Sequence, residues 1–167
     1  MDEILIRPAR AGDADFLADM LVEAANTPSH PGRSRAEALA DPAVARYVEG
    51  WPRATDLGVV AERPGRPVGA AWLRYFDETA PGYGYVRSDV PELAIGVDAA
   101  NRGNGIGRDL LRALHDAARQ RGIDQVCLSV ERANPAARLY ASEGFEVVDR
   151  REIADTMLLS LWGCPER

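Results

Sequence analysis

The chain has 167 residues, enough for one domain with a substantial core, and we expect residues 1–167 to form a single domain. Hydrophobic residues make up 46% and charged residues 28%, which is the composition of a soluble globular protein. The formal net charge of −6 argues against nucleic-acid binding, because that function needs a basic face.

Cysteine content and hydropathy indicate the cellular compartment in which the protein works. The two cysteines, Cys127 and Cys164, give neither a disulfide framework nor a metal-ligand spacing. No apolar run has the length of a membrane span, and the N-terminus does not resemble a signal peptide. We therefore expect a cytoplasmic protein with no membrane partner and no metal site.

The first third of the chain predicts one strand followed by helices. Residues 4–6 form a short apolar strand, and residues 13–25 keep the apolar spacing of a helix. Residues 26–32 have the composition of an irregular loop. Two further helix starts follow, a capping box at Ser34 and an Asp-Pro start at Asp41.

A hairpin and a long loop come next. Residues 57–62 and 68–74 predict two antiparallel strands joined by a Pro-Gly turn. Residues 75–90 contain three tyrosines, one phenylalanine and several carboxylates. Loops of this length are often functional. A passive surface loop whose tyrosines lie on the core is an equally good interpretation at this point.

The second half alternates strands and helices. We expect strands at residues 92–97, 125–130, 145–148 and 156–162, and helices at residues 108–121 and 134–143. The first two of these strands should be parallel, because a helix connects them. We expect Cys127 to be a small core residue and His115 to be exposed on its helix. The pattern predicts an α/β (α+β) protein with a mixed central sheet of six to seven strands and helices on both faces.

A glycine-rich turn precedes the helix at 108–121. Gly103, Gly105 and Gly107 leave backbone N–H groups uncovered at the positive end of the helix dipole, and Arg102 adds a fixed charge. Such a turn is a ready phosphate site, and we expect it to hold a diphosphate. A dinucleotide-binding fingerprint does not fit, because its third glycine would come one residue later and its turn follows the strand more tightly. A P-loop is excluded because no Gly-Lys-Ser/Thr follows.

The spacing Arg102-x-x-Gly105-x-Gly107 resembles the acetyl-CoA-binding motif of the GNAT N-acetyltransferase superfamily. The resemblance covers roughly residues 90–147, and it includes Leu93–Val97, Asn134–Tyr140 and Glu143–Phe145. It implies the GNAT fold, acetyl-CoA as acyl donor, and direct attack by a primary amine in a ternary complex. It also implies that residues 26–50 contribute to acceptor specificity. A homodimer is common among similar proteins, and nothing in the sequence decides it.

The resemblance also assigns the donor site. The backbone of Ile95 and Val97 would bind the pantetheine arm, and the N–H of Ile95 would polarise the thioester carbonyl. The implied coenzyme-binding residues are Ile95, Gly96, Val97, Arg102, Gly103, Asn104, Gly105, Ile106, Gly107, Arg108 and Asn134. Asn134 also reads as a plain helix cap, and the sequence does not separate its two roles.

Two residues are implied for catalysis, Tyr140 and Glu92. Tyr140 would protonate the leaving thiolate, since a phenol can give its proton to a thiolate as it departs. Glu92 would accept the amine proton. In some relatives that glutamate lies one position earlier, where this chain has Pro91, and a shift of one residue reverses the face of a strand. The alternatives for the base are Asp77, Glu78, Tyr85 and Asp89 in the adjacent loop, or a water chain.

A rival function remains open, a non-catalytic acyl-CoA-binding or regulatory module of the same fold. The presence of Tyr140 and Glu92 favours the enzyme. The sequence leaves the acceptor undecided among small amines, amino acids, aminoglycosides and protein N-termini or lysines.

Overall fold

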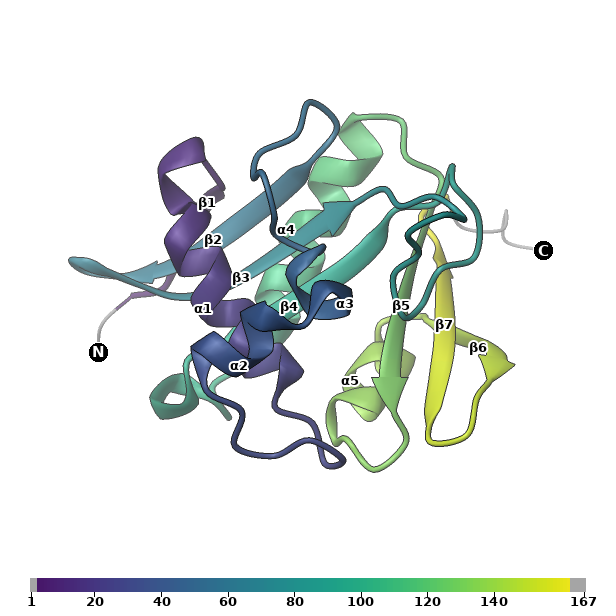
Figure 1. The fold of residues 1–167 in the computed structure, drawn as a ribbon. Coiled ribbons are helices and arrows are strands. Elements are labelled where there is room, and N and C mark those ends of the chain that lie inside the picture. Colours follow the sequence, from purple (N-terminus) through teal and green to yellow (C-terminus); the bar gives the residue numbers. More distant parts are fainter. Residues whose placement is uncertain (1–2, 163–167) are drawn as a thin grey trace.

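Seven short segments pair into one mixed sheet (Figure 1). The computed structural model describes residues 3–162. The strands are β1 (Leu5–Pro8), β2 (Leu57–Arg63), β3 (Arg66–Arg74), β4 (Glu92–Val97), β5 (Gln125–Glu131), β6 (Glu146–Arg150) and β7 (Ala154–Ser160). Their order in the sheet is β1-β2-β3-β4-β5-β7-β6. The expected mixed sheet of six to seven strands is confirmed.

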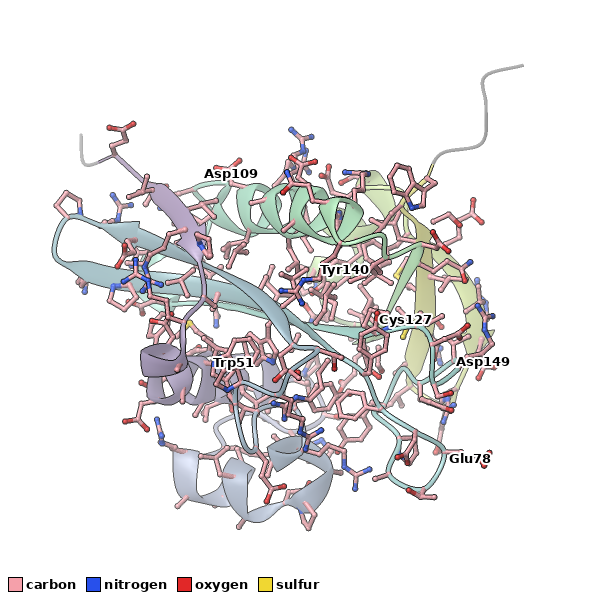
Figure 2. All side chains as sticks on the ribbon, turned by 90° about the horizontal axis from the view of Figure 1, so that it is seen from above. Trp51, Glu78, Asp109, Cys127, Tyr140 and Asp149 are labelled. Atoms are coloured by element: carbon pink, nitrogen blue, oxygen red, sulfur yellow. The ribbon has the colours of Figure 1, made fainter. Side chains whose placement is uncertain are left out.

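Helices cover both faces of this sheet, as Figure 2 shows from above. The helices are α1 (Ala14–Ala25), α2 (Arg35–Ala40), α3 (Pro42–Ala45), α4 (Ile106–Gln120) and α5 (Ala136–Ser142), with short 3₁₀ turns η1 (Ala11–Asp13) and η2 (Ala99–Asn101). The first three helices pack on one face and the last two on the other. The face under α1–α3 is called the acceptor face below, because it carries residues 26–50, the segment that the resemblance predicts to contribute to acceptor specificity.

The sheet separates two hydrophobic cores. Leu110, Leu111 and Leu114 of α4 are fully buried in the core on one face. Leu17 of α1 and Trp72 of β3 are fully buried in the core on the acceptor face. The apolar stripe of α4 therefore decides on which side of the sheet this helix packs.

Strands β4 and β5 meet at only one point. They are parallel, and their register contains the single pair Glu92 and Cys127. By contrast, β4 pairs with β3 over all of Glu92–Val97, and β5 pairs with β7 over all of Gln125–Glu131. Beyond Glu92 the two parallel strands therefore separate inside an otherwise continuous sheet.

Several sequence expectations need correction. His115 was expected to be exposed, but only 4% of its surface is accessible and its ring packs against Phe145 at 5.7 Å between ring centres. The charged residues next to His115 in the sequence suggested exposure, but its position on the helix lies on the side of α4 that faces the sheet. The helix begun by Asp41 is one turn long. Strand and helix ends differ from expectation by up to about two residues, as is usual. Cys127 is buried as expected, and Cys164 lies outside the described residues.

Candidate active site

The edge of β4 that faces β5 carries unpaired backbone groups. The N–H of Asp98 donates to the carbonyl of Val68 on β3 at 2.8 Å. Because successive N–H groups of a strand point to opposite sides, that of Gly96 also faces β3, whereas those of Ile95 and Val97 face β5. Since β5 has already separated there, these groups have no strand partner. Such donors need a ligand or water.

The turn before α4 provides a second set of free donors. Gly103 and Gly105 have φ angles of 80° and 78°, which only glycine adopts without strain. The first N–H to bond inside the helix is that of Asp109, which donates to the carbonyl of Gly105 at 3.1 Å. Within the described chain, no N–H of residues 103–108 donates to another protein group. These donors, at the positive end of the α4 dipole, fit a diphosphate.

The other residues expected to bind the coenzyme have different surroundings. A Cβ on Gly107 would meet only Leu139, at 3.5 Å, so packing does not require glycine there. A Cβ on Gly96 would lie 2.3 Å from the carbonyl oxygen of Met20, so packing of α1 does require that glycine. The side chain of Arg108 turns away from the turn and donates to Ser142 at 3.1 Å. Its backbone N–H is the group left for a ligand.

Two side chains of the turn are already engaged. The guanidinium of Arg102 pairs with Glu23 of α1 at 2.6 Å, and its Nε donates to the carbonyl of Val97 at 3.3 Å. Asn104 donates to the carbonyl of Asn101 at 3.2 Å, which closes the turn on itself. Ile106 is buried, so only its backbone is available to a ligand.

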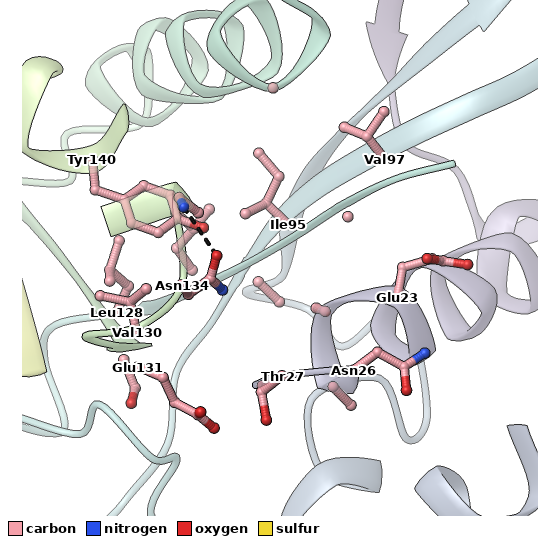
Figure 3. A pocket seen from close by; sticks show the side chains of 18 of the residues that line it. Glu23, Asn26, Thr27, Ile95, Val97, Leu128, Val130, Glu131, Asn134 and Tyr140 are labelled. Atoms are coloured by element: carbon pink, nitrogen blue, oxygen red, sulfur yellow. Dashed lines mark hydrogen bonds between the residues drawn. The ribbon is translucent and has the colours of Figure 1, made fainter. Parts of the chain in front are cut away.

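One cavity of about 1220 Å³ joins this turn to the gap between β4 and β5 and to the acceptor face (Figure 3). Its walls include the turn, Ile95 and Val97 of β4, Tyr140 of α5, and Glu92. The cavity exceeds the usual size range of small-molecule sites, so it has room for a long ligand and a second substrate.

Glu92 lies on the acceptor face and is 2% exposed. The N–H of Gly84 donates to both carboxylate oxygens at 3.1 Å, and the hydroxyl of Tyr47 donates to Oε2. Burial raises the pKa of Glu92 to about 7, and the hydrogen bonds from Tyr47 and Gly84 act in the opposite direction. A carboxyl that titrates near neutrality is suited to accept a proton. Because Pro91 occupies the position of the glutamate in some relatives, the side chain of Glu92 could have pointed away from the acceptor. Glu92 nevertheless lines the cavity.

The alternative bases from the loop do not line this cavity. Asp77 is exposed and accepts hydrogen bonds from Thr79. Asp89 is exposed and pairs with Arg87 at 3.1 Å. Glu78 is also exposed, at the periphery of the molecule in Figure 2. Tyr85 packs against the core on the acceptor face. Among the candidates raised from the sequence, only Glu92 reaches the cavity.

Tyr140 lies on the opposite wall. It is 8% exposed, and its ring contacts Phe145 edge-on at 5.9 Å between ring centres. Its hydroxyl has no hydrogen-bond partner among residues 3–162, so the local bond that would make it purely structural is missing from the described chain. Burial raises its pKa to about 12, so the phenol keeps its proton at neutral pH. Nearby, Oδ1 of Asn134 accepts the N–H of Ala136 at 2.9 Å, which is a capping bond (Figure 3).

Sequence reasoning pointed to the segments 26–50 and 75–90 but did not single out the cavity residues within them. Ser29, in the loop between α1 and α2, donates to Glu131 at the end of β5 through its N–H at 3.0 Å and its hydroxyl at 2.5 Å. Tyr47 and Tyr83 also line the cavity. A signal for the tyrosines was present, because the glycines that flank Tyr83 are typical of a close backbone approach. A Cβ on Gly84 would lie 2.4 Å from the carbonyl carbon of Leu128.

Residues 3–162 contain neither a candidate metal site nor a candidate membrane-spanning helix. No group of three or more histidine, cysteine, aspartate or glutamate side chains is arranged to hold a metal ion. No helix in this part of the chain has both the length and the apolar character needed to cross a membrane.

Relatives with related sequences are named mycothiol acetyltransferases. The protein from Kocuria rhizophila is 35% identical over 150 residues, which are 86% of this chain and 46% of the relative. That from Thermobispora bispora is 41% identical over 87 residues, which are 52% of this chain and 28% of the relative. The chain thus spans half or less of the length of these curated relatives.

Solved structures share the fold. An N-acetyltransferase from Thermoplasma acidophilum in complex with coenzyme A superposes with a TM-score of 0.65 at 18% identity, covering 95% of this chain and 99% of that one. Ribosomal-protein-alanine N-acetyltransferase from Brucella melitensis superposes with a TM-score of 0.63 at 28% identity, covering 92% and 96%. The model of the acetyltransferase (GNAT) domain family matches residues 55–147, more than half of the chain. The chain therefore belongs to the GNAT acetyltransferase family.

Proposed function

We propose that this protein transfers an acetyl group from acetyl-CoA to a primary amine by direct attack in a ternary complex. One observation carries the proposal. A single cavity contains free amides for a diphosphate, an unpaired strand edge for an extended arm, and two side chains suited to proton transfer on opposite walls. Membership of the acetyltransferase family supports the same reaction.

The donor would bind along the turn and the open edge of β4. The N–H groups of residues 103–108 would hold the diphosphate, with the charge of Arg102 beside them. The N–H groups of Ile95 and Val97 and the carbonyl of Ile95 would hold the arm, and the N–H of Ile95 would stabilise charge on the thioester oxygen. Asn134 would contact the same arm through its free amide nitrogen.

The proton steps would use the two opposite walls. As the amine nitrogen bonds to the carbonyl carbon and the carbon–sulfur bond breaks, Glu92 would take a proton from the nitrogen. Tyr140 would give its proton to the departing sulfur and recover one from solvent. No cysteine nucleophile is needed, and burial raises the pKa of Cys127 to about 12, so its thiol stays protonated.

The acceptor is proposed as a class only. A primary amine would enter from the acceptor face, past residues 26–50. The names of the relatives make the unacetylated precursor of mycothiol the first amine to try. We propose the cytoplasm as the setting of the reaction, because the two cysteines of the sequence give no disulfide framework.

The test is a panel of amines with acetyl-CoA, followed through the formation of coenzyme A. The chain has no lysine, so acetylation of its own lysine side chains cannot add a background signal. We expect saturable turnover with at least one amine, and a strong loss in Glu92→Gln. Binding of acetyl-CoA without turnover on any amine would instead favour the non-catalytic module. A protein that does not bind acetyl-CoA would overturn the proposal.

A further inference from the structure

The segment after α3 is fastened to the sheet on both sides of Tyr47. The Nε1 of Trp72 donates to the carbonyl of Tyr47 at 2.8 Å. Nη1 of Arg74 donates to the carbonyls of Arg46 and Glu49, at 3.0 and 2.7 Å. Both donors lie on β3 and are fully or almost fully buried. The backbone that carries Tyr47 is therefore held against the strand beside β4.

Arg74 is itself fixed by a buried partner. Its Nη2 lies 2.6 Å from Oδ2 of Asp56 and its Nε 3.1 Å from Oδ1, so the contact is bidentate. Both side chains are 1% exposed. A buried two-bond pair of this kind has little freedom of orientation. The same guanidinium therefore anchors the segment 46–49 in one place.

The surroundings of Tyr47 direct the hydrogen bond that its hydroxyl group donates. Its ring packs edge-on against Phe76 at 5.0 Å and stacks on Tyr83 at 6.3 Å between ring centres. Its oxygen accepts the N–H of Tyr83 at 2.8 Å. The hydroxyl proton is then directed to the carboxylate of Glu92. The result is a chain of donors that ends on this carboxylate.

The loop between β3 and β4 closes over this pair. A Cβ on Gly82 would lie 2.3 Å from Oε1 of Glu92 and 2.8 Å from the hydroxyl oxygen of Tyr47. Glycine at this position lets the backbone lie against the carboxylate of Glu92, which is 2% exposed and lines the cavity. These contacts hold one carboxylate in one orientation.

We propose that Tyr47 is a positioning residue for Glu92, holding its carboxylate toward the cavity in the ionised form that accepts the amine proton. This inference rests on the proposed acetyl transfer. It gives a role to the segment after α3 and to the loop at 82–84, which the roles of Glu92 and Tyr140 alone leave unexplained.

The other titratable groups around Glu92 do not compete with it near neutral pH. Burial, and then the charge of Glu92, raise the pKa of Tyr47 well above its usual range. Cys127 of β5 stays protonated for the same two reasons. Two arginines also face Glu92: Arg74 is its register partner on β3, and the charge of Arg151, after β6, lowers the pKa of its carboxyl. The carboxyl of Glu92 is thus the group in this cluster that changes charge near pH 7.

The kinetic test compares pH profiles of kcat/KM. Without the phenol donor, the pKa of Glu92 should rise, so Tyr47→Phe should move the acidic limb upward by about one pH unit. The rate should fall about five-fold at pH 7 and recover at alkaline pH. Tyr75→Phe is the matched control, because Tyr75 lies outside the cavity, and it should leave the profile unchanged. A Tyr47→Phe enzyme with an unmoved acidic limb would overturn the inference.

A double-variant comparison asks whether Tyr47 acts through Glu92. Tyr47→Phe should have no further effect in a Glu92→Gln background, because the group that it positions is gone. A second loss of equal size in that background would show that Tyr47 acts independently, and the inference would be wrong.

Carbon-13 NMR gives a readout that needs neither turnover nor a variant. The labelled carboxyl carbon of Glu92 and the ring carbon bearing the hydroxyl of Tyr47 should titrate with one shared midpoint in the wild-type protein. Separate midpoints, or no response at Tyr47, would contradict the inference even if acetyl transfer is established. Failure of acetyl transfer itself would appear separately, as a wild-type protein without turnover on any amine.

Discussion

Glu92 and Cys127 form the one pair at which β4 and β5 are in register, and the strands separate beyond it. Ile95 lies three residues further along β4, about 10 Å away along an extended strand. The carboxylate and the free amide edge therefore belong to one strand, whose other side is fully paired with β3. The sheet itself fixes the distance between the carboxylate that we propose as proton acceptor and the strand edge that we propose to bind the donor.

Gly107 offers the cleanest test of the diphosphate site. A Cβ there would meet only Leu139, at an ordinary contact distance of 3.5 Å, and glycine disfavours a helix. Gly107→Ala should therefore raise the free energy of unfolding by about 0.5–1 kcal/mol. Gly107→Glu should fold equally well, since an acidic residue suits a helix N-terminus, yet it should abolish acetyl-CoA binding. Calorimetry and thermal melting of both variants check this pair, and tight binding by Gly107→Glu would remove the turn from the site.

Tyr140→Phe should lower turnover while leaving acetyl-CoA affinity nearly unchanged. The hydroxyl has no partner in the described chain, so its removal breaks no protein hydrogen bond. General acid catalysis typically contributes about 100-fold or more to a rate. Single-turnover kinetics alongside a calorimetric Kd separate the two quantities. Equal turnover by the variant would exclude Tyr140 as the acid.

His115 and Glu92 should affect stability in opposite directions as pH changes. Burial lowers the pKa of His115 from 6.5 to about 4, so its contribution is present above pH 6.5 and is lost as pH falls through 4. Burial raises the pKa of Glu92 from 4.5 to about 7, so its contribution is present below pH 4.5 and is lost as pH rises through 7. Each effect is worth about 3 kcal/mol.

In the wild-type protein, the contributions of His115 and Glu92 to the pH dependence of the free energy of unfolding should nearly cancel between pH 4.5 and 6.5. A variant that removes one of the two groups should reveal the contribution of the other. His115→Leu should make stability fall as pH rises from 4.5 to 6.5, whereas Glu92→Gln should make it rise. Urea unfolding across this range measures both. Parallel curves for the wild type and either variant would contradict the buried state assigned to that residue.

The buried Arg74–Asp56 pair should be much more important for stability than an exposed one. Asp56→Ala leaves a buried guanidinium without its partner and should cost about 3–5 kcal/mol. The comparison is Asp89→Ala, which breaks the exposed pair with Arg87 and should change stability by less than about 1 kcal/mol. Chemical denaturation gives both values. Similar small losses would show that Arg74 does not depend on Asp56.

The sequence was sufficient for the features that depend on local chemistry. The apolar stripe of α4, the Asp-Pro start at Asp41 and the glycine turn each follow from residue type and spacing. His115 was misjudged because its helical position, rather than its charged neighbours, decides burial. The contact between Tyr47 and Glu92 could not be predicted from the sequence, because the two residues are 45 positions apart and meet only in the folded protein. The Ser29–Glu131 contact likewise depends on the tertiary fold.

We propose that the free amides of residues 103–108 and the open edge of β4 hold acetyl-CoA. Calorimetric titration with acetyl-CoA measures this binding directly. We expect saturable binding of one equivalent by the wild-type protein and by Gly107→Ala, and none by Gly107→Glu. A wild-type titration without heat, together with an unshifted melting temperature, would contradict it.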